Sequence, residues 1–284
     1  MQQHPETEPN LVIQISVFLL IVLGSLFVLY KLFGFFEMAY VEYIKKRLFF
    51  NHIYFKKKQL NNEQRYIISK YFKLYNNLSL DYKSYFEHRV AVILNELEFI
   101  GKSIDITEEM KLIISGTLVK LTFGFRDYKI NSVERILIYP DEFYSQINKA
   151  YHKGEFNPAY RALVMSWKDV LFGYEVEDDN LNLAIHEFIH AIHFYFISVR
   201  KKSTSAAIFL DSFYDLTVSL DANEALKSSL VSSGYLRDYA YTNQFEFLSV
   251  IVETFIETPK EFKHRFPGLY SQVKQMLNYN FNGY

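Results

Sequence analysis

The pentad His186-Glu187-Phe188-Ile189-His190 is the feature that most restricts how this chain can fold. In a helix, residues four apart lie on the same face, so the two imidazoles project together with Glu187 beside them. The flanking residues are mostly apolar, and a buried group of imidazoles and a carboxylate needs polar partners. A zinc ion is such a partner, because both histidines can bind it while the glutamate acts on a metal-bound water. The sequence therefore predicts a zinc-binding helix over residues 180–198; the alternative is an ordinary amphipathic helix that contains two histidines.

The composition limits which metal ligands are available. The chain has no cysteine, which excludes thiolate ligands, disulfides and cysteine nucleophiles, so a zinc ion must be held by histidine and carboxylate side chains. Half of the 284 residues are hydrophobic, which is enough for a sizeable core. The net charge is −1, so the charge balance gives no reason to expect a nucleic-acid partner.

An apolar run near the N-terminus, Leu11–Tyr30, contains no charged residue. Its length matches the hydrocarbon core of a bilayer, which is about 30 Å thick. A cleaved signal peptide has a basic start and a shorter apolar run, whereas residues 1–10 contain Glu6 and Glu8 and no Lys or Arg. A buried core helix is the other alternative. We predict a tail over residues 1–10 and a transmembrane anchor over residues 11–36.

Basic residues follow the apolar run and do not precede it. Because such residues favour the cytoplasmic side, we predict a single-pass protein of the inner (cytoplasmic) membrane whose catalytic domain faces the cytoplasm. Residues 37–60 are basic and aromatic, which indicates either a juxtamembrane segment near anionic headgroups or a helix of the soluble domain with a solvated basic face. The basic residues are Lys31, Lys45, Lys46, Arg47, Lys56, Lys57 and Lys58.

The remaining residues, 61–284, are predicted to form one α+β domain in which helices predominate. Strands are expected at residues 136–139 and 162–165, and Asp105-Ile-Thr-Glu108 resembles a capping box that opens a helix. The helices are predicted over residues 61–78, 81–100, 105–121, 180–198, 205–230 and 243–257, and beyond Pro267.

A catalytic zinc site needs a third protein ligand besides the two pentad histidines. His193 shares their helix face, but three ligands on one rigid helix do not easily surround a tetrahedral ion; His264 is a further candidate. Glu246 and Glu253 are seven residues apart, so both carboxylates fall on one stripe of an apolar helix. Glu246 also stands at capping-box spacing from Asn243, where it would only satisfy the helix N-terminus. The residues alone leave the choice between Glu246 and Glu253 open.

The pentad belongs to a series of sequence blocks within residues 60–275. The blocks are ITEEMKLIISGTLVKLTFGF, ILIYPDEF, LVMSWKDVLFG, NLAIHEFIHAI and YAYTNQFEFLSVIVETFIETPKEFKHRFPGLY. In content and order they resemble the Mlc titration factor family, which consists of glucose-regulated zinc peptidases related to the catalytic domain of anthrax lethal factor.

This resemblance implies a zincin-like α+β fold and hydrolysis of peptide bonds with an aminopeptidase character. It implies that His186, His190 and Glu246 are zinc ligands and that Glu187 is the general base. Tyr239, seven residues before Glu246, matches the tyrosine that supports the tetrahedral intermediate in the family.

The chain departs from the family pattern in two places. His193 stands where the family usually has an aspartate three residues after the pentad, and FYFISVRKKSTSAA replaces a loop that is usually rich in glycine and aspartate. The imidazole of His193 replaces a carboxylate that would support the metal ligands from outside, which changes how those ligands are held. The altered loop leaves the substrate preference open.

Together these features predict a membrane-anchored zinc peptidase that acts on a peptide or protein substrate. The strand Ala162–Trp167 is expected to hold an extended peptide as an added strand, and Trp167 to pack in the core. One alternative is a membrane-tethered regulatory protein that binds a partner such as a transcription repressor, with a residual or structural metal site. Another is a zinc hydrolase that acts on a non-peptide amide.

Overall fold

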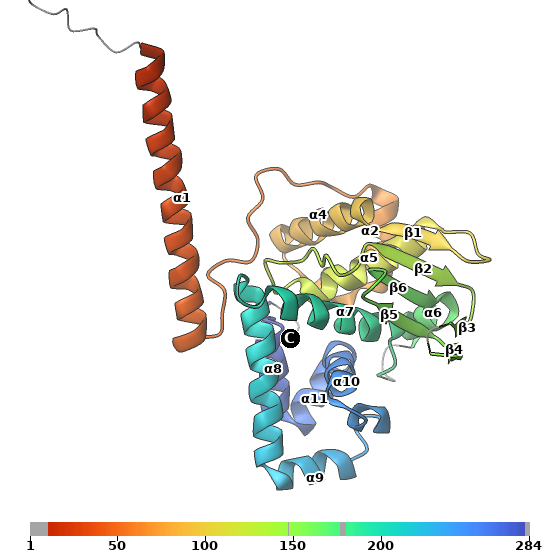
Figure 1. The fold of residues 1–284 in the computed structure, drawn as a ribbon. Helices are drawn as coiled ribbons and strands as arrows, with labels where there is room; N and C mark the ends of the chain where they lie inside the picture. The colour runs from red at the N-terminus through yellow and green to blue at the C-terminus, as the bar shows by residue number, and fades with distance from the viewer. Residues whose placement is uncertain (1–10, 147, 177–179, 282–284) are drawn as a thin grey trace, which may run out of the picture. The chain divides into compact units, whose positions relative to one another are not determined.

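The N-terminal unit of the chain is one long helix, α1 (Leu11–Tyr43) (Figure 1). The computed structural model describes residues 11–146, 148–176 and 180–281, and its contacts divide the chain after Lys45. Within these ranges α1 is the one helix long and apolar enough to cross a membrane, and its apolar side chains are exposed. The predicted tail, residues 1–10, lies outside the described residues.

A four-stranded sheet organises the second unit. Its order is β1-β2-β6-β5; β1, β2 and β6 are parallel, and β5 pairs antiparallel with β6. β6 therefore has a strand on each side, whereas β5 forms an edge. The strands are β1 (Glu98–Gly101), β2 (Arg135–Tyr139), β5 (Gly154–Asn157) and β6 (Ala162–Ser166), and β3 (Phe143–Ser145) and β4 (Ala150–His152) form a separate antiparallel pair.

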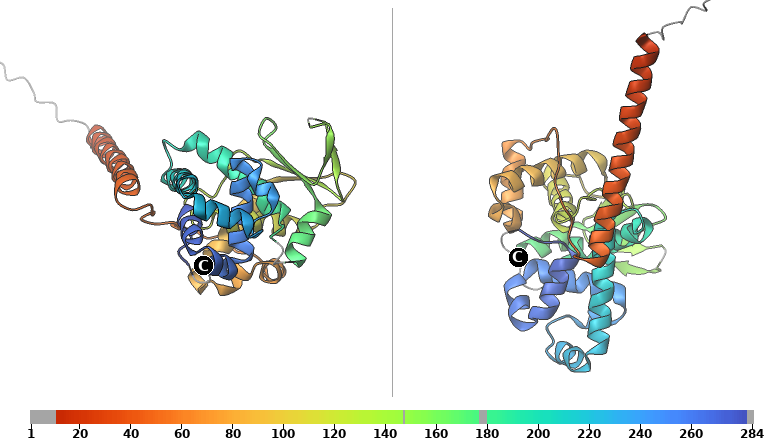
Figure 2. Two further views of the ribbon diagram at one scale, coloured as in Figure 1. Left: turned by 90° about the horizontal axis from the view of Figure 1, so that it is seen from below. Right: turned by 90° about the vertical axis from the view of Figure 1, so that its left-hand side faces the viewer.

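Helices form most of the rest of this unit, so the fold is α+β with helices predominating, as predicted. α7 is central: it packs against β5 and β6 and against α5, α8 and α10. Figure 2 shows the sheet on one side of the unit and α8–α12 on the other. The helices are α2 (Asn62–Tyr71), α3 (Lys73–Asn77), α4 (Leu80–Glu96), α5 (Glu108–Thr122), α6 (Trp167–Glu175), α7 (Leu183–Val199), α8 (Thr204–Ala222), α9 (Glu224–Ser232), the short 3-10 helix η1 (Asp238–Tyr241), α10 (Gln244–Glu257), α11 (Pro259–Arg265) and α12 (Pro267–Met276).

Several predicted boundaries differ from the structure. The helix expected to reach residue 100 ends at Glu96, and the next residues form β1 as the neighbour of β2. The helix expected over 205–230 is divided at Asn223, whose side chain caps α9. The N-cap of α5 is Thr107 and not Asp105, because the Thr107 hydroxyl accepts from the Met110 amide.

Residues 46–60 belong to the second unit and are held by a buried arginine. Arg89, on α4, is fully buried and donates from Nε to the Tyr54 hydroxyl at 2.6 Å and from Nη2 to the Asn51 carbonyl at 3.0 Å. The same guanidinium donates to the Thr122 and Phe125 carbonyls at 3.0 and 2.8 Å. The second unit therefore begins at Lys46, so residues 46–60, predicted either as a juxtamembrane segment or as a helix of the soluble domain, pack with that unit without forming a helix.

Candidate metal centre

The helix α7 brings the two pentad histidines together. Asn182 starts the helix, since its side chain accepts a hydrogen bond from the Ile185 amide at 3.1 Å. His186 and His190 follow one turn apart, and their Nε2 atoms lie 3.1 Å from each other. The helix is buried among apolar residues of the core on its other faces, so its register and the direction of the imidazoles are fixed.

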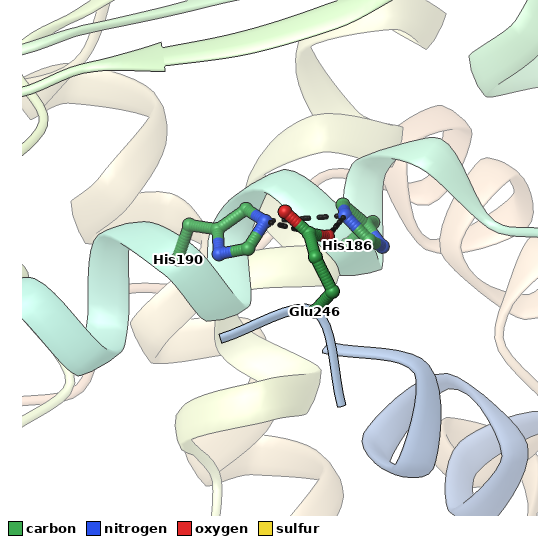
Figure 3. Close-up of side chains that lie close together, drawn as sticks. All are labelled: His186, His190 and Glu246. Atoms are coloured by element: carbon green, nitrogen blue, oxygen red, sulfur yellow. Dashed lines mark hydrogen bonds and ion pairs between the residues drawn. The ribbon is translucent and has the colours of Figure 1, made fainter. Parts of the chain in front are cut away.

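The helix α10 supplies a carboxylate to the same place (Figure 3). Glu246 Oε2 lies 2.9 Å from His186 Nε2 and 3.5 Å from His190 Nε2. Asn243 caps α10 by accepting from the amides of Phe245 and Glu246, and no reciprocal bond returns from the Glu246 side chain. The capping-box alternative for Glu246 is therefore wrong, and its carboxylate is directed at the histidines.

These three ligand atoms fit a tetrahedral zinc ion. Ligand atoms about 2.0–2.1 Å from such an ion lie about 3.3 Å apart, and the separations here are 2.9, 3.1 and 3.5 Å. Glu246 Oε2 is buried and receives no hydrogen bond of acceptable geometry from the described residues. Lone pairs on two nitrogens and an oxygen that face one another favour a cation between them. The donor set and its spacing thus suit a metal ion.

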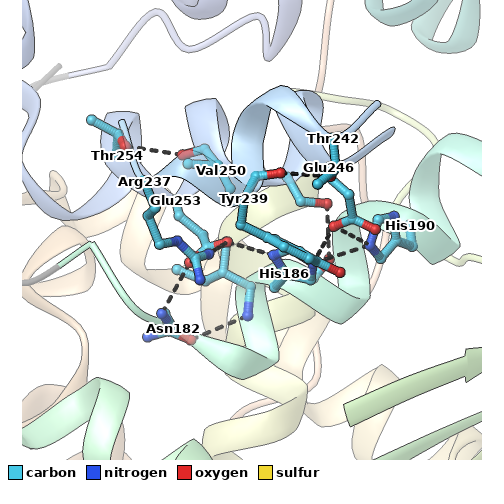
Figure 4. Close-up of polar contacts among 12 residues, drawn as sticks. Asn182, His186, His190, Arg237, Tyr239, Thr242, Glu246, Val250, Glu253 and Thr254 are labelled. Atoms are coloured by element: carbon cyan, nitrogen blue, oxygen red, sulfur yellow. Dashed lines mark hydrogen bonds and ion pairs between the residues drawn. The ribbon is translucent and has the colours of Figure 1, made fainter. Parts of the chain in front are cut away.

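An outer layer of polar groups holds His186 (Figure 4). Its Nδ1 lies 2.6 Å from Glu253 Oε1, and because a carboxylate only accepts, Nδ1 carries the proton and Nε2 presents its lone pair to the cluster. Glu253 is fully buried and also accepts from Arg237 Nη2 at 2.7 and 2.8 Å and from the Asn182 amide at 3.1 Å. Glu253 therefore orients His186 and lies outside the three-residue cluster.

The protonation states of His186 and Glu246 depend on each other. Burial lowers the pKa of the His186 imidazole, but the neighbouring carboxylates of Glu246 and Glu253 outweigh it and raise this pKa to about 9. Burial opposes ionisation of Glu246, yet the two histidines hold the pKa of its carboxyl well below the usual range. Both pKa shifts have the same cause: positive charge next to the Glu246 carboxylate is favourable.

Glu187 lies beside the histidines and next to the sheet. It is buried, and burial raises the pKa of its carboxyl, which makes it a better proton acceptor. Gly154, the first residue of β5, leaves room for it: a Cβ at this position would be 2.6 Å from Glu187 Oε1 and 2.7 Å from its Cγ. Glycine at the start of the edge strand is therefore required for the observed position of Glu187.

Tyr239 forms one wall of the site. It belongs to η1, is half exposed, and its ring centroid lies 5.9 Å from that of His186. Burial and the nearby Glu246 carboxylate raise the pKa of its phenol, so the hydroxyl remains a hydrogen-bond donor at neutral pH. Arg237, two residues earlier, is bound to Glu253, so one short segment supports both His186 and Tyr239.

Other residues considered as ligands lie outside the cluster. His193 is buried with its ring against those of Phe213 and Phe245, and burial lowers the pKa of its imidazole to about 4. It therefore behaves as a neutral core residue. His264 lies on α11 and does not belong to the group formed by His186, His190 and Glu246.

A cleft of about 500 Å³ opens beside His186, Glu187 and Tyr239. Leu181, Phe172 and Tyr151 contribute apolar surface to it, and its charged lining is mixed, because Lys153 is paired with Asp169 and Arg237 with Glu253. The expectation that strand Ala162–Trp167 binds a peptide is wrong, because β2 and β5 occupy both sides of β6, and Trp167 begins α6. The free edge beside the cleft is that of β5.

The sequence did not identify the roles of three supporting residues. Arg237 and Gly154 act through contacts with residues far away in the chain, and nothing in their neighbourhood marks them. Glu253 was recognised as a buried carboxylate, but its role as acceptor for His186 Nδ1 depends on the way α10 crosses α7.

Replacing Gly154 with alanine is expected to displace the Glu187 carboxylate and to lower turnover by about 10²-fold without loss of metal, because a shift of about 1 Å in a catalytic group has an effect of this size. Steady-state kinetics and elemental analysis of the purified protein would measure both quantities. Gly268→Ala is the matched control, since nothing lies within 4 Å of a Cβ there. Normal turnover in Gly154→Ala would show that the position of Glu187 does not matter.

Comparison with known proteins assigns the chain to a family. The family model described as glucose-regulated metallo-peptidase M90 matches residues 45–278, which begin at the boundary between the two units and include α7 and α10. An uncharacterized protein from Synechocystis sp. is 24% identical over 222 residues, which cover 71% of this chain and 78% of the relative. The family indicated by the sequence blocks is thereby confirmed, and the chain belongs to the glucose-regulated metallo-peptidase M90 family.

Proposed function

We propose that this metallopeptidase is a zinc-dependent peptidase whose ion is held by His186, His190 and Glu246. The observation that carries the proposal is the meeting of three ligand atoms from α7 and α10 within 3.5 Å of one another, next to a buried glutamate. Two imidazoles and one carboxylate are a common donor set for catalytic zinc. A zinc ion bound there would supply a Lewis acid that polarises the peptide carbonyl and acidifies a bound water.

The chain's own residues divide the remaining chemistry between them. Glu187 accepts a proton from the attacking water and returns it to the leaving amine, for which its raised pKa is suited. Tyr239 donates a hydrogen bond from its hydroxyl to the oxyanion that develops on the carbonyl. Glu253 and Arg237 keep His186 in one tautomer and one orientation.

The edge of β5 is the proposed binding strand for the substrate. Its backbone groups on the side away from β6 are available to an extended peptide, and it starts at Gly154 beside Glu187. Antiparallel addition of a peptide to this edge would place a backbone carbonyl next to the ligand cluster. Recognition through the backbone accommodates many side chains, which suits a peptide or protein substrate.

Membrane attachment belongs to the same proposal. α1 is long and apolar enough for one crossing, and the basic residues all follow its apolar part. Because such residues favour the cytoplasmic side, α1 is proposed as a single-pass anchor that holds the second unit at the cytoplasmic face of the membrane.

Metal content separates the two glutamates. We expect one zinc ion per wild-type chain, loss of that ion in Glu246→Ala, and retention with about 10–100-fold weaker affinity in Glu253→Ala, as is typical when an outer carboxylate is removed. Elemental analysis and titration against a competing chelator would measure this, with Glu224→Ala on the exposed part of α9 as control. Loss of zinc from Glu253→Ala alone would assign the third ligand to Glu253.

A further inference from the structure

The face of α7 that carries the histidines continues beyond them as exposed apolar surface. Counted from His186, positions 190, 194 and 197 fall within about 80° around the helix axis. Phe194 is 49% exposed and Ile197 is 56% exposed, although both lie on the same stripe as the ligands. Exposed apolar side chains that continue a functional site indicate a binding surface.

Two neighbouring elements extend this surface. On β5, side chains alternate, so Gly154 and Phe156 face α7, and the Phe156 ring packs edge-on against Phe194 with centroids 5.7 Å apart. Glu155, between them, points to the other side of the strand, where it accepts from Asn148. On α10, Phe245 precedes Glu246, is 55% exposed, and packs its ring against that of His193 on α7, with centroids 5.3 Å apart.

The direction of the strand determines which part of a peptide meets this surface. β5 runs from Gly154, which contacts Glu187, to Phe156, which contacts Phe194, and it therefore runs in the same sense as α7. A peptide paired antiparallel with β5 runs the opposite way. Its residues before the scissile bond lie over Phe156 and Phe194, and its residues after that bond enter the cleft that Arg237 lines.

We propose that Phe156, Phe194, Ile197 and Phe245, here called the apolar shelf, bind the substrate residues that precede the scissile bond. The inference rests on the proposed peptidase function and specifies its substrate: an internal peptide bond preceded by bulky apolar residues. This substrate differs from the aminopeptidase character that the sequence resemblance implies, because a substrate cut after its first residue ends near the metal and does not reach Phe194 and Ile197. The shelf selects for longer chains because each buried apolar side chain strengthens binding.

Binding without turnover is the first test. Full-length Glu187→Gln protein in lipid nanodiscs, loaded with zinc, would be titrated against two fluorescein-labelled decapeptides of equal composition. One has Leu-Phe before a central Ala-Ala and the other has Leu-Phe after it. We expect at least tenfold tighter binding of the first, and loss of this difference in Phe194→Ser and Phe245→Ser. Tyr66→Ser, an exposed aromatic residue on α2, should keep the difference.

Cleavage by the wild-type chain is the second test, because it separates the shelf from the peptidase function. Mass spectrometry of the products should show an internal cut after the apolar pair, and acetylation of the peptide N-terminus should not slow it. Equal binding of the two peptides, tighter binding of the second, or stepwise removal of N-terminal residues that acetylation blocks would overturn the shelf assignment while leaving a peptidase. The expected binding pattern without any cleavage would uphold the shelf and refute the peptidase function.

Discussion

Replacing Glu187 with glutamine is expected to lower turnover by about 10²–10⁴-fold while zinc remains bound. Glutamine keeps the size of the side chain but cannot accept the proton of the attacking water. The proposed ligand atoms come from His186, His190 and Glu246, so the metal content should not change. Steady-state kinetics on a fluorogenic peptide and elemental analysis of the same sample would measure the two effects.

A matched control for this substitution is Glu63→Gln, which changes an exposed carboxylate in the first turn of α2, outside the cleft and the cluster. It should keep normal turnover. A protein that only binds a regulatory partner would show no change in function when Glu187 is replaced, and this outcome would favour the tethered binding protein over the peptidase. Loss of zinc from Glu187→Gln would instead make this residue part of the metal-binding structure.

The second large effect concerns where the catalytic region begins. A chain of residues 46–284 should fold, whereas a chain of residues 61–284 should be unfolded or strongly destabilised. The longer deletion removes the Tyr54 hydroxyl and the Asn51 carbonyl, both acceptors for the buried Arg89 guanidinium, and the buried Leu48 and Leu60. Loss of partners for a buried charge costs about 3–5 kcal/mol, comparable to the 5–15 kcal/mol that stabilises a typical domain.

Thermal unfolding followed by circular dichroism, together with gel filtration, would compare the two truncated chains. Tyr54→Phe in the 46–284 chain provides a graded control: it removes one acceptor and should lower the free energy of unfolding by about 1–3 kcal/mol. Equal melting temperatures for the two chains would show that Arg89 does not need residues 46–60.

The local parts of the site were predictable from the sequence, because they depend on spacing within one helix. The i, i+4 relation placed His186 and His190 together with no knowledge of the rest of the fold. The choice between Glu246 and Glu253 could not be made from spacing within one helix. Both fall on the same stripe of α10, and only the crossing of α10 over α7 decides that one reaches Nε2 and the other Nδ1 of the same imidazole.

The helices were predicted better than the strands for a similar reason. α5, α7 and α10 have regular apolar spacing and a capping residue at the start. β1 continues the apolar pattern of α4 and is a strand only because β2 lies beside it. β5 is four residues long and contains glycine, so its own sequence carries little preference for a strand.

The shortness of β5 has a consequence for solubility. An uncovered strand edge can pair with the same edge of another copy and start aggregation. β5 offers only four residues, Lys153 precedes it, and Pro158, which has no amide hydrogen to donate, follows it. An extended peptide needs only a few backbone hydrogen bonds at such an edge, whereas a lasting sheet between two copies needs a longer run. The strand can thus stay open to incoming peptides without pairing with the same strand of another copy.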